Sequence, residues 1–188
     1  MGATKEEAAA TRQRLIDVAI GLLRTRGPNS FTLDLVAKES GVSKGGLLHH
    51  FPSKNALIEE VLHYLIHDFD ARACALYEAQ PAQSGGWLRA YILATFDDSN
   101  LDTALPIEVA AMLFTALSEQ TVLQKLIQED AQHWHERLTS DGVTPARAML
   151  IRHAADAYWM DRMFAPLSYD DELRKAFIAE LIQLTEVP

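Results

Sequence analysis

The chain has 188 residues, of which 48% are hydrophobic and 23% are charged, proportions that are ordinary for a globular protein. It has no apolar run near the roughly 20 residues of a membrane-spanning helix, and Cys74, its only cysteine, excludes an internal disulfide, so we expect a cytoplasmic protein with no membrane partner. The net charge of −9 is distributed unevenly along the chain. Residues 1–55 hold eight bases and five acids (+3), whereas residues 56–188 hold nine bases and 21 acids (−12). This asymmetry is expected when only one end of a protein binds a polyanion.

The N-terminal part has the apolar spacing of helices and no alternating run of strand-forming residues. Apolar residues from Leu15 to Leu23 follow one face of a first helix, which Gly27-Pro28-Asn29 ends. Thr32 is placed to cap a second helix over Leu33–Ser40. Gly41 follows that helix at the position where a left-handed C-terminal cap favours glycine.

Two further helices follow closely. Ser43 is placed to cap a short third helix from Lys44 to Phe51. Pro52-Ser53 starts a long fourth helix, Lys54–Glu78, with an apolar stripe along one side.

The rest of the chain continues the helical pattern, so the predicted fold is all-α with about nine helices. The later helices are expected at Trp87–Phe96, Ile107–Leu117, Thr121–Leu138, from Thr144-Pro145 onward, and at Leu173–Leu184. Ser168 and Asp171 resemble a capping box for the last of them.

The eighth predicted helix is apolar on nearly every face, so it must be covered on all sides. A chain of this size covers only part of such a helix by itself, which favours a subunit interface made by the last two helices. The alternative is a buried core within one chain. The candidate interface residues are Ile151, Ala155, Trp159, Met163, Phe177, Leu181 and Leu184.

The spacing of Ala37, Gly41 and Leu47 is that of a helix-turn-helix, in which a small residue, a turn glycine and an apolar anchor let two helices pack closely. Gly45 and Gly46 then stand in the first turn of the second helix, where each costs about 0.5–1 kcal/mol relative to alanine. Close approach of the backbone to a DNA duplex explains that cost. The alternative is a weak helix held by packing alone.

The stretch "TRQRLIDVAIGLLRTRGPNSFTLDLVAKESGVSKGGLLHHFPSKNALI", residues 11–58, resembles the DNA-binding domain of the TetR family of bacterial transcriptional repressors. The matching positions are Gly41-Val42-Ser43, Gly45, His50, Phe51, Ser53 and Lys54. The resemblance implies a three-helix helix-turn-helix domain over residues 1–53 and a helical effector-binding and dimerisation domain over residues 54–188. In the second domain the resemblance is one of architecture.

The resemblance also implies which residues contact DNA, by phosphate contacts, base contacts or close backbone approach. They are Thr32, Ser43, Lys44, Gly45, Gly46, His49, His50 and Lys54. One position departs from the family pattern, because Leu48 stands where a tyrosine often donates a hydrogen bond to phosphate. His49 is expected to replace it, and DNA affinity is expected to rise below about pH 6.5 as the imidazoles gain charge.

The mechanism implied by the family couples two sites. A homodimer places two recognition helices about 34–36 Å apart, in successive major grooves of a pseudo-palindromic operator. A small-molecule effector in the acidic body favours a shape with the wrong spacing, so the repressor leaves the DNA. The fourth helix joins the two domains and is the expected lever.

The effector site is the least determined feature of the sequence. Several large residues are candidates for lining an apolar pocket, with ordinary core packing as the alternative. They are Trp87, Tyr91, Phe96, Met112, Phe114, Trp134 and Tyr158.

Three other functions are weighed against a regulator of this kind. His63 and His67 with Asp70, and His133 and His135 with Glu136, have spacings compatible with a metal sensor, but exposed or hydrogen-bonded histidines are the preferred interpretation. An enzyme is disfavoured, because no phosphate loop, nucleophile elbow or HExxH motif is present, and no cofactor is expected. A helical adaptor for protein partners leaves the glycines and histidines of the third helix unexplained.

Overall fold

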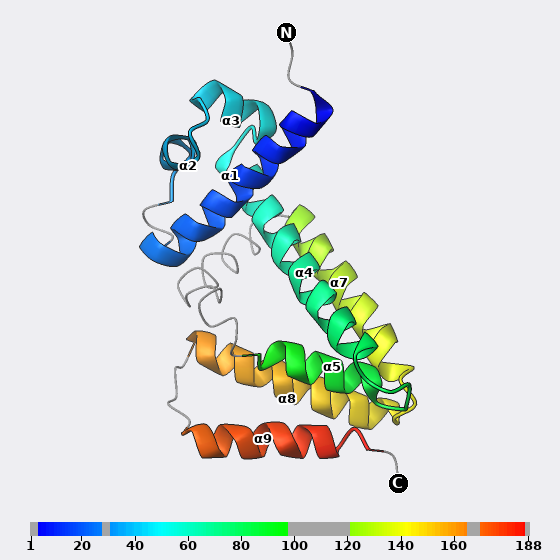
Figure 1. The fold of residues 1–188 in the computed structure, drawn as a ribbon. Coiled ribbons are helices and arrows are strands. Elements are labelled where there is room, and N and C mark those ends of the chain that lie inside the picture. The colour runs from blue at the N-terminus through cyan, green and yellow to red at the C-terminus, as the bar shows by residue number, and fades with distance from the viewer. Residues whose placement is uncertain (1–3, 28–30, 98–120, 165–169, 187–188) are drawn as a thin grey trace. The chain divides into compact units, whose positions relative to one another are not determined.

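The computed structural model describes residues 4–27, 31–97, 121–164 and 170–186, and every regular element in these ranges is an α-helix (Figure 1). The helices are α1 (Lys5–Arg26), α2 (Leu33–Ser40), α3 (Lys44–His50), α4 (Lys54–Glu78), α5 (Gly86–Thr95), α7 (Thr121–Thr139), α8 (Pro145–Phe164) and α9 (Asp171–Gln183). The prediction of an all-α fold is therefore confirmed. The predicted sixth helix, Ile107–Leu117, lies outside the described residues.

Helix ends follow local capping signals closely. Helices α2 and α4 begin and end at the predicted residues. The predicted capping box at Ser168 and Asp171 is wrong, because Asp170 is the N-cap of α9 and its carboxylate accepts a hydrogen bond from the Leu173 backbone N–H at 2.7 Å. A carboxylate at this position satisfies one of the four unpaired N–H groups of the first turn.

The chain forms two compact units. Among the described residues, unit 1 contains residues 4–27 and 31–65, and unit 2 contains residues 66–97, 121–164 and 170–186. Helix α4 belongs to unit 1 through Leu65 and to unit 2 from Ile66 onward. The functional boundary between residues 53 and 54 stays a prediction.

Unit 1 is a helix-turn-helix built on α1. Ala37 on α2 and Leu47 on α3 are 5% and 0% exposed and belong to one buried core. Gly41 has φ 68°, the left-handed conformation that glycine adopts without strain. The Val42 N–H reaches back to the Ala37 carbonyl oxygen at 3.1 Å, which closes the turn between α2 and α3.

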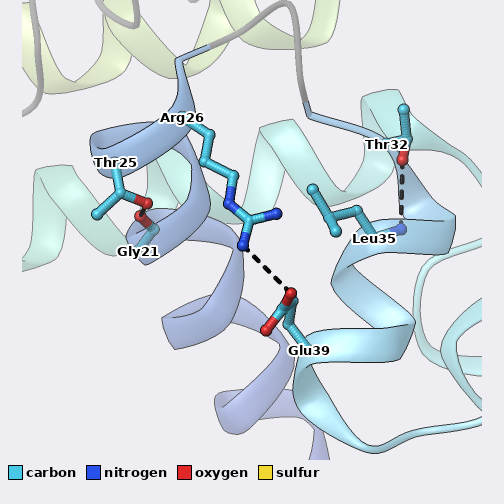
Figure 2. Close-up of polar contacts among 6 residues, drawn as sticks. All are labelled: Gly21, Thr25, Arg26, Thr32, Leu35 and Glu39. Atoms are coloured by element: carbon cyan, nitrogen blue, oxygen red, sulfur yellow. Dashed lines mark hydrogen bonds and ion pairs between the residues drawn. The ribbon is translucent and has the colours of Figure 1, made fainter.

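Figure 2 shows a polar contact at each end of α2. The Thr32 hydroxyl oxygen accepts a hydrogen bond from the Leu35 backbone N–H at 3.2 Å. Arg26 near the end of α1 forms an ion pair with Glu39 on α2 at 3.4 Å (Figure 2). The cap and the packing of α2 on α1 together fix the position of α2, and α3 packs against α2.

Unit 2 packs around α5, which contacts α7, α8 and α9 (Figure 1). Side chains from other elements hold both ends of α5. The Asp141 carboxylate accepts a hydrogen bond from the Leu88 N–H at 2.9 Å, and Arg72 donates to the Ala94 carbonyl oxygen at 3.1 Å. None of the described helices is long and apolar enough to cross a membrane.

Candidate DNA interface and ligand site

The eight predicted DNA-binding residues all lie in unit 1, and none of them is buried. Gly46 and His50 are partly buried, and the other six are exposed: Thr32, Ser43, Lys44, Gly45, His49 and Lys54. Beneath them, Leu47 and Phe51 are 0% and 1% exposed and anchor α3 in the core of unit 1. The face of α3 opposite these buried residues is therefore exposed to solvent.

The two glycines of α3 have different structural environments. A methyl group built on Gly46 would meet Val42 Cγ1 at 3.0 Å and Ser43 Oγ at 3.2 Å, so close packing within the chain favours glycine there. A methyl group on Gly45 would meet nothing within 4 Å. The described contacts of the chain give no steric reason for a glycine at position 45, so packing around this position does not offset its helix cost.

The hydroxyl groups of Thr32 and Ser43 cap α2 and α3. The Ser43 oxygen accepts from the Gly46 N–H at 3.1 Å, as the Thr32 oxygen accepts from Leu35. Each hydroxyl uses its oxygen as the acceptor in these bonds, which leaves its proton available to donate to a phosphate oxygen. One side chain can therefore serve both the helix start and a DNA contact.

Two lysines of this surface have partners within the chain. Lys44 Nζ lies 2.8 Å from Asp34 Oδ1, but both side chains are largely exposed. An exposed pair of this kind contributes about 0–1 kcal/mol, so exchange of Asp34 for a DNA phosphate costs little. Lys54 Nζ lies 5.4 Å from the centre of the buried Phe31 ring, which holds its ammonium near the start of α4.

The histidines of α3 lie together, with ring centres 5.5 Å apart. Burial, the neighbouring His49 and the guanidinium of Arg12 all lower the pKa of His50 from its ordinary 6.5. The expectation that His50 gains charge as soon as the pH falls below about 6.5 is therefore corrected, because its protonation needs a lower pH. A lowered pKa in the folded state favours the neutral imidazole, so this group stabilises the fold above pH 6.5 and ceases to do so as the pH falls through its folded pKa.

Arg12 is a residue of this surface that sequence reasoning missed. Its guanidinium lies 4.6 Å from the centre of the Phe51 ring and pairs with Glu60 at 2.6 Å. The pair joins α1 to α4 across 48 positions of sequence, so no local pattern revealed it. Arg12 thereby steadies the end of α3.

Most of the predicted ligand residues in unit 2 pack against one another. Tyr91, Trp134 and Phe69 form edge-to-face contacts with ring centres 5.1–5.5 Å apart. Tyr91 and Phe96 are each 7% exposed and Trp134 is 2% exposed, so in this structure they are core residues. Met112 and Phe114 lie outside the described residues.

A polar group is buried inside this aromatic cluster. The Tyr91 hydroxyl donates a hydrogen bond to Asp156 Oδ1 at 2.5 Å, and Arg152 lies 3.5 Å from the other oxygen of that carboxylate. Burial and the neighbouring Asp156 raise the pKa of Tyr91 well above its ordinary value. The hydroxyl therefore stays protonated and acts as a donor that joins α5 to α8.

Tyr91→Phe is expected to lower the free energy of unfolding by about 1–3 kcal/mol, because it removes the donor to a partly buried carboxylate. Urea denaturation followed by circular dichroism measures the change. Tyr64→Phe is the matched control, since the Tyr64 side chain is 38% exposed, and it is expected to shift the midpoint little. Equal shifts in the two variants would contradict a stabilising role for the Tyr91–Asp156 bond.

Two cavities of unit 2 include predicted ligand residues. One, of about 420 Å³, is lined by Tyr77, Gln83, Ser84, Trp87, Arg137, Ser140, Asp141 and Gly142. In it Trp87 stacks on Tyr77 with ring centres 3.9 Å apart, and the Arg137 guanidinium lies 4.2 Å from the Trp87 ring centre. The other, of about 360 Å³, lies between α8 and α9 and is lined by Ala154, Ala157, Tyr158, Asp161, Leu173, Arg174 and Phe177.

Three of the predicted interface residues are corrected by their burial. Ile151, Ala155 and Leu181 are 0–3% exposed within the single chain, so they have no surface left to bury against a second copy. Phe177 and Leu184 are partly buried, and the side chains of Trp159 and Met163 lie outside the described residues. Among their described side chains, the large apolar ones that α8 and α9 expose are Met149, Leu150, Met160 and Leu173.

The histidine pairs considered for a metal sensor do not form a metal site in the described part of the chain. No group of three or more His, Cys, Asp or Glu residues is placed there to hold an ion. Asp70 forms an ion pair with Arg137 at 2.8 Å, whereas the His133 ring nitrogen is 3.8 Å from the same oxygen. Asp70 therefore has a structural partner already.

Family models match both parts of the chain. A model described as "Bacterial regulatory proteins, tetR family" matches residues 15–61, which include α2, α3 and the start of α4. A model described as "Tetracyclin repressor-like, C-terminal domain" matches residues 85–186, more than half of the chain.

Two similar proteins are named as transcriptional regulators. The HTH-type transcriptional regulator BetI of Serratia proteamaculans is 31% identical over 134 residues, which are 69% of this chain and 66% of that protein, so the match spans about two thirds of BetI. The HTH-type transcriptional regulator AcrR of Shigella flexneri is 24% identical over 197 residues, covering 96% of this chain and 92% of that protein.

Solved structures agree on the fold. A transcriptional regulator from Rhodococcus sp. Rha1 superposes with a TM-score of 0.72 at 20% identity, covering 94% of this chain and 99% of the other. The multidrug binding protein EbrR, solved as a complex with ethidium, superposes with a TM-score of 0.65 at 23% identity, covering 94% and 99% of the two chains. At these identities the likeness concerns the fold alone.

Proposed function

Because the chain belongs to the TetR family of bacterial transcriptional regulators, we propose that it is a homodimeric repressor that a small-molecule effector releases from a pseudo-palindromic operator. Unit 1 is the DNA-binding part and unit 2 carries the dimer contacts and the effector. Such a protein meets its DNA in the cytoplasm. It has no catalytic role, since the family consists of regulators and not of enzymes.

The observation that carries the DNA-binding proposal is the outward face of α3. Lys44, Gly45 and His49 are exposed on it, and Gly45 has an unfavourable helix position without a packing reason in the described chain. Thr32 and Lys54 supply further donors at the starts of α2 and α4. A helical adaptor that binds proteins leaves this combination of glycine, cations and capping hydroxyls unexplained.

The dimer proposal rests on the outward faces of α8 and α9, which lie side by side (Figure 1). Leu150 and Leu173 are 59% and 56% exposed, values that are high for leucine. Leu173 also lines the mostly apolar cavity between the two helices. A second copy that packs the same faces would bury these side chains in a two-fold symmetric interface.

The effector proposal rests on the family of the C-terminal part and on the cavity at Trp87. That cavity, of about 420 Å³, is in the size range of small-molecule sites and is lined by aromatic and polar side chains. The structural relative EbrR has been solved with ethidium, imidazole and malachite green. By linkage, an effector that weakens operator binding is itself bound more weakly by the operator complex, typically by about 5- to 150-fold.

Selection of bound duplexes from a random DNA pool is expected to recover an inverted repeat. Affinity for the recovered operator should fall by about 1000-fold or more between 50 and 200 mM salt, because phosphate contacts release counterions. Lys54→Ala should weaken binding to all sequences and reduce the salt slope by about one for each half-site. Filter binding or fluorescence anisotropy across salt concentrations measures both effects.

Lys125→Ala is the matched control, because Lys125 is an exposed lysine on α7 in unit 2. It is expected to leave the operator affinity and the salt slope unchanged. If no sequence is enriched, or if both lysine variants behave alike, unit 1 is not the DNA-binding part.

A further inference from the structure

Helix α3 turns one large apolar side chain toward solvent. Leu48 is 38% exposed, whereas Leu47 beside it is fully buried. Among the described residues of unit 1, Leu48 is the only large aliphatic side chain that is exposed to this degree. An exposed leucine contributes little to the fold, so Leu48 keeps apolar surface available for an external contact.

The neighbours of Leu48 on the helix are Lys44 and Gly45. Residues three and four positions apart lie on one side of a helix, so Leu48, Gly45 and Lys44 share a side of α3. The Cβ position of Gly45 meets nothing within 4 Å. The space at Gly45, on the same side of α3 as Leu48, is therefore open, while the Lys44 ammonium is paired with Asp34 at 2.8 Å.

The major groove offers one alkyl group that fits such a space. Guanine, cytosine and adenine present hydrogen-bond donors and acceptors on their base edges, and thymine adds its C5-methyl group. A leucine gains nothing from a polar edge, since it cannot satisfy a donor or an acceptor. It gains from contact with the methyl group, which it removes from water.

We propose that Leu48 contacts the C5-methyl group of one thymine in each half-site of the operator, with that methyl group in the space above Gly45. The inference rests on the proposed DNA-binding function and adds a base preference to it. It also assigns a role to the residue that departs from the family pattern at this position, since a leucine cannot donate a hydrogen bond to phosphate.

Deoxyuridine is the probe, because it pairs with adenine as thymidine does and lacks only the methyl group. Each thymine of the selected operator is replaced in turn, in both half-sites at once, and the Kd of the wild-type protein is measured by anisotropy. At one thymine position the wild type is expected to lose about 4-fold in affinity per half-site, the equivalent of about 0.8 kcal/mol for one apolar carbon.

The variants Leu48→Ala and His49→Ala complete the test. Leu48→Ala should bind the thymine and uracil operators equally at that position. Because the site is exposed, this variant is expected to fold as the wild type does, which circular dichroism checks. His49→Ala, on the same face, should bind more weakly overall but keep the difference between thymine and uracil.

Two results would overturn the inference while operator binding stands. One is the absence of any thymine position at which uracil weakens the wild type. The other is an equal penalty for uracil in the wild type and in Leu48→Ala. If the wild type enriches no operator at all, the proposed function fails, and this inference fails with it.

Discussion

Leu173→Glu is expected to leave the protein monomeric and to weaken operator binding by about 100- to 10,000-fold. Leu173 lies in the first turn of α9, is 56% exposed and lines the cavity between α8 and α9. A glutamate there would place an unpaired charge in the proposed interface, and an uncompensated buried charge is strongly destabilising. Binding to DNA weakens because a monomer has one recognition helix, without the effective concentration that a linked second helix supplies.

Light scattering after size exclusion measures the oligomeric state, and anisotropy with the selected operator measures affinity. Leu93→Glu is the matched control, since Leu93 is also an exposed leucine of unit 2, on α5. It should remain dimeric and bind normally. A Leu173→Glu protein that stays dimeric with full affinity would exclude this part of the α8–α9 surface as the interface.

Gly45→Ala is expected to change two measurements in opposite directions. The free energy of unfolding should rise by about 0.5–1 kcal/mol, because alanine is the better helix former and its methyl group meets nothing within 4 Å. Operator affinity should fall by about 10-fold or more, since the methyl group fills the space that the DNA needs and overpacking costs about 1–3 kcal/mol. Urea denaturation and operator titration measure the two effects.

Gly21→Ala separates the two effects. Gly21 lies within α1, and a methyl group built there also meets nothing within 4 Å. This variant should gain a similar stability and keep its operator affinity. A stabilised Gly45→Ala protein with unchanged affinity would mean that the backbone at position 45 does not approach the DNA. The same substitution at Gly46 is less informative, because Val42 and Ser43 lie close to its Cβ position.

The sequence by itself determined the helices of unit 1 and their turn. Thr32 and Ser43 as caps, and Gly41 in the left-handed conformation, define α2 and α3 at the predicted starts. These signals work from sequence because a cap satisfies backbone groups only two or three residues away. The family resemblance over residues 11–58 depends on the same local features, and the match over residues 15–61 agrees with it.

The predictions for unit 2 were less complete, because burial there depends on residues far apart in sequence. Ile151 and Ala155 have the same apolar character as Leu150, yet the first two are buried in the core and Leu150 is 59% exposed. A helix that is apolar on every side does not show which side its own chain covers. Only the packing of α5 and α7 on α8 decides that.

Only the tertiary structure showed which partners certain polar residues have and what surrounds the glycines of α3. Tyr91 bonds to Asp156 across 65 positions, and Arg12 pairs with Glu60 across 48. It likewise distinguished Gly45 from Gly46, which are identical in sequence terms but differ in what surrounds their Cβ positions. Caps and turns depend on residues that are close in sequence, so the sequence predicts them. Core packing and buried hydrogen bonds join residues that are distant in sequence, so they form only when the helices pack together.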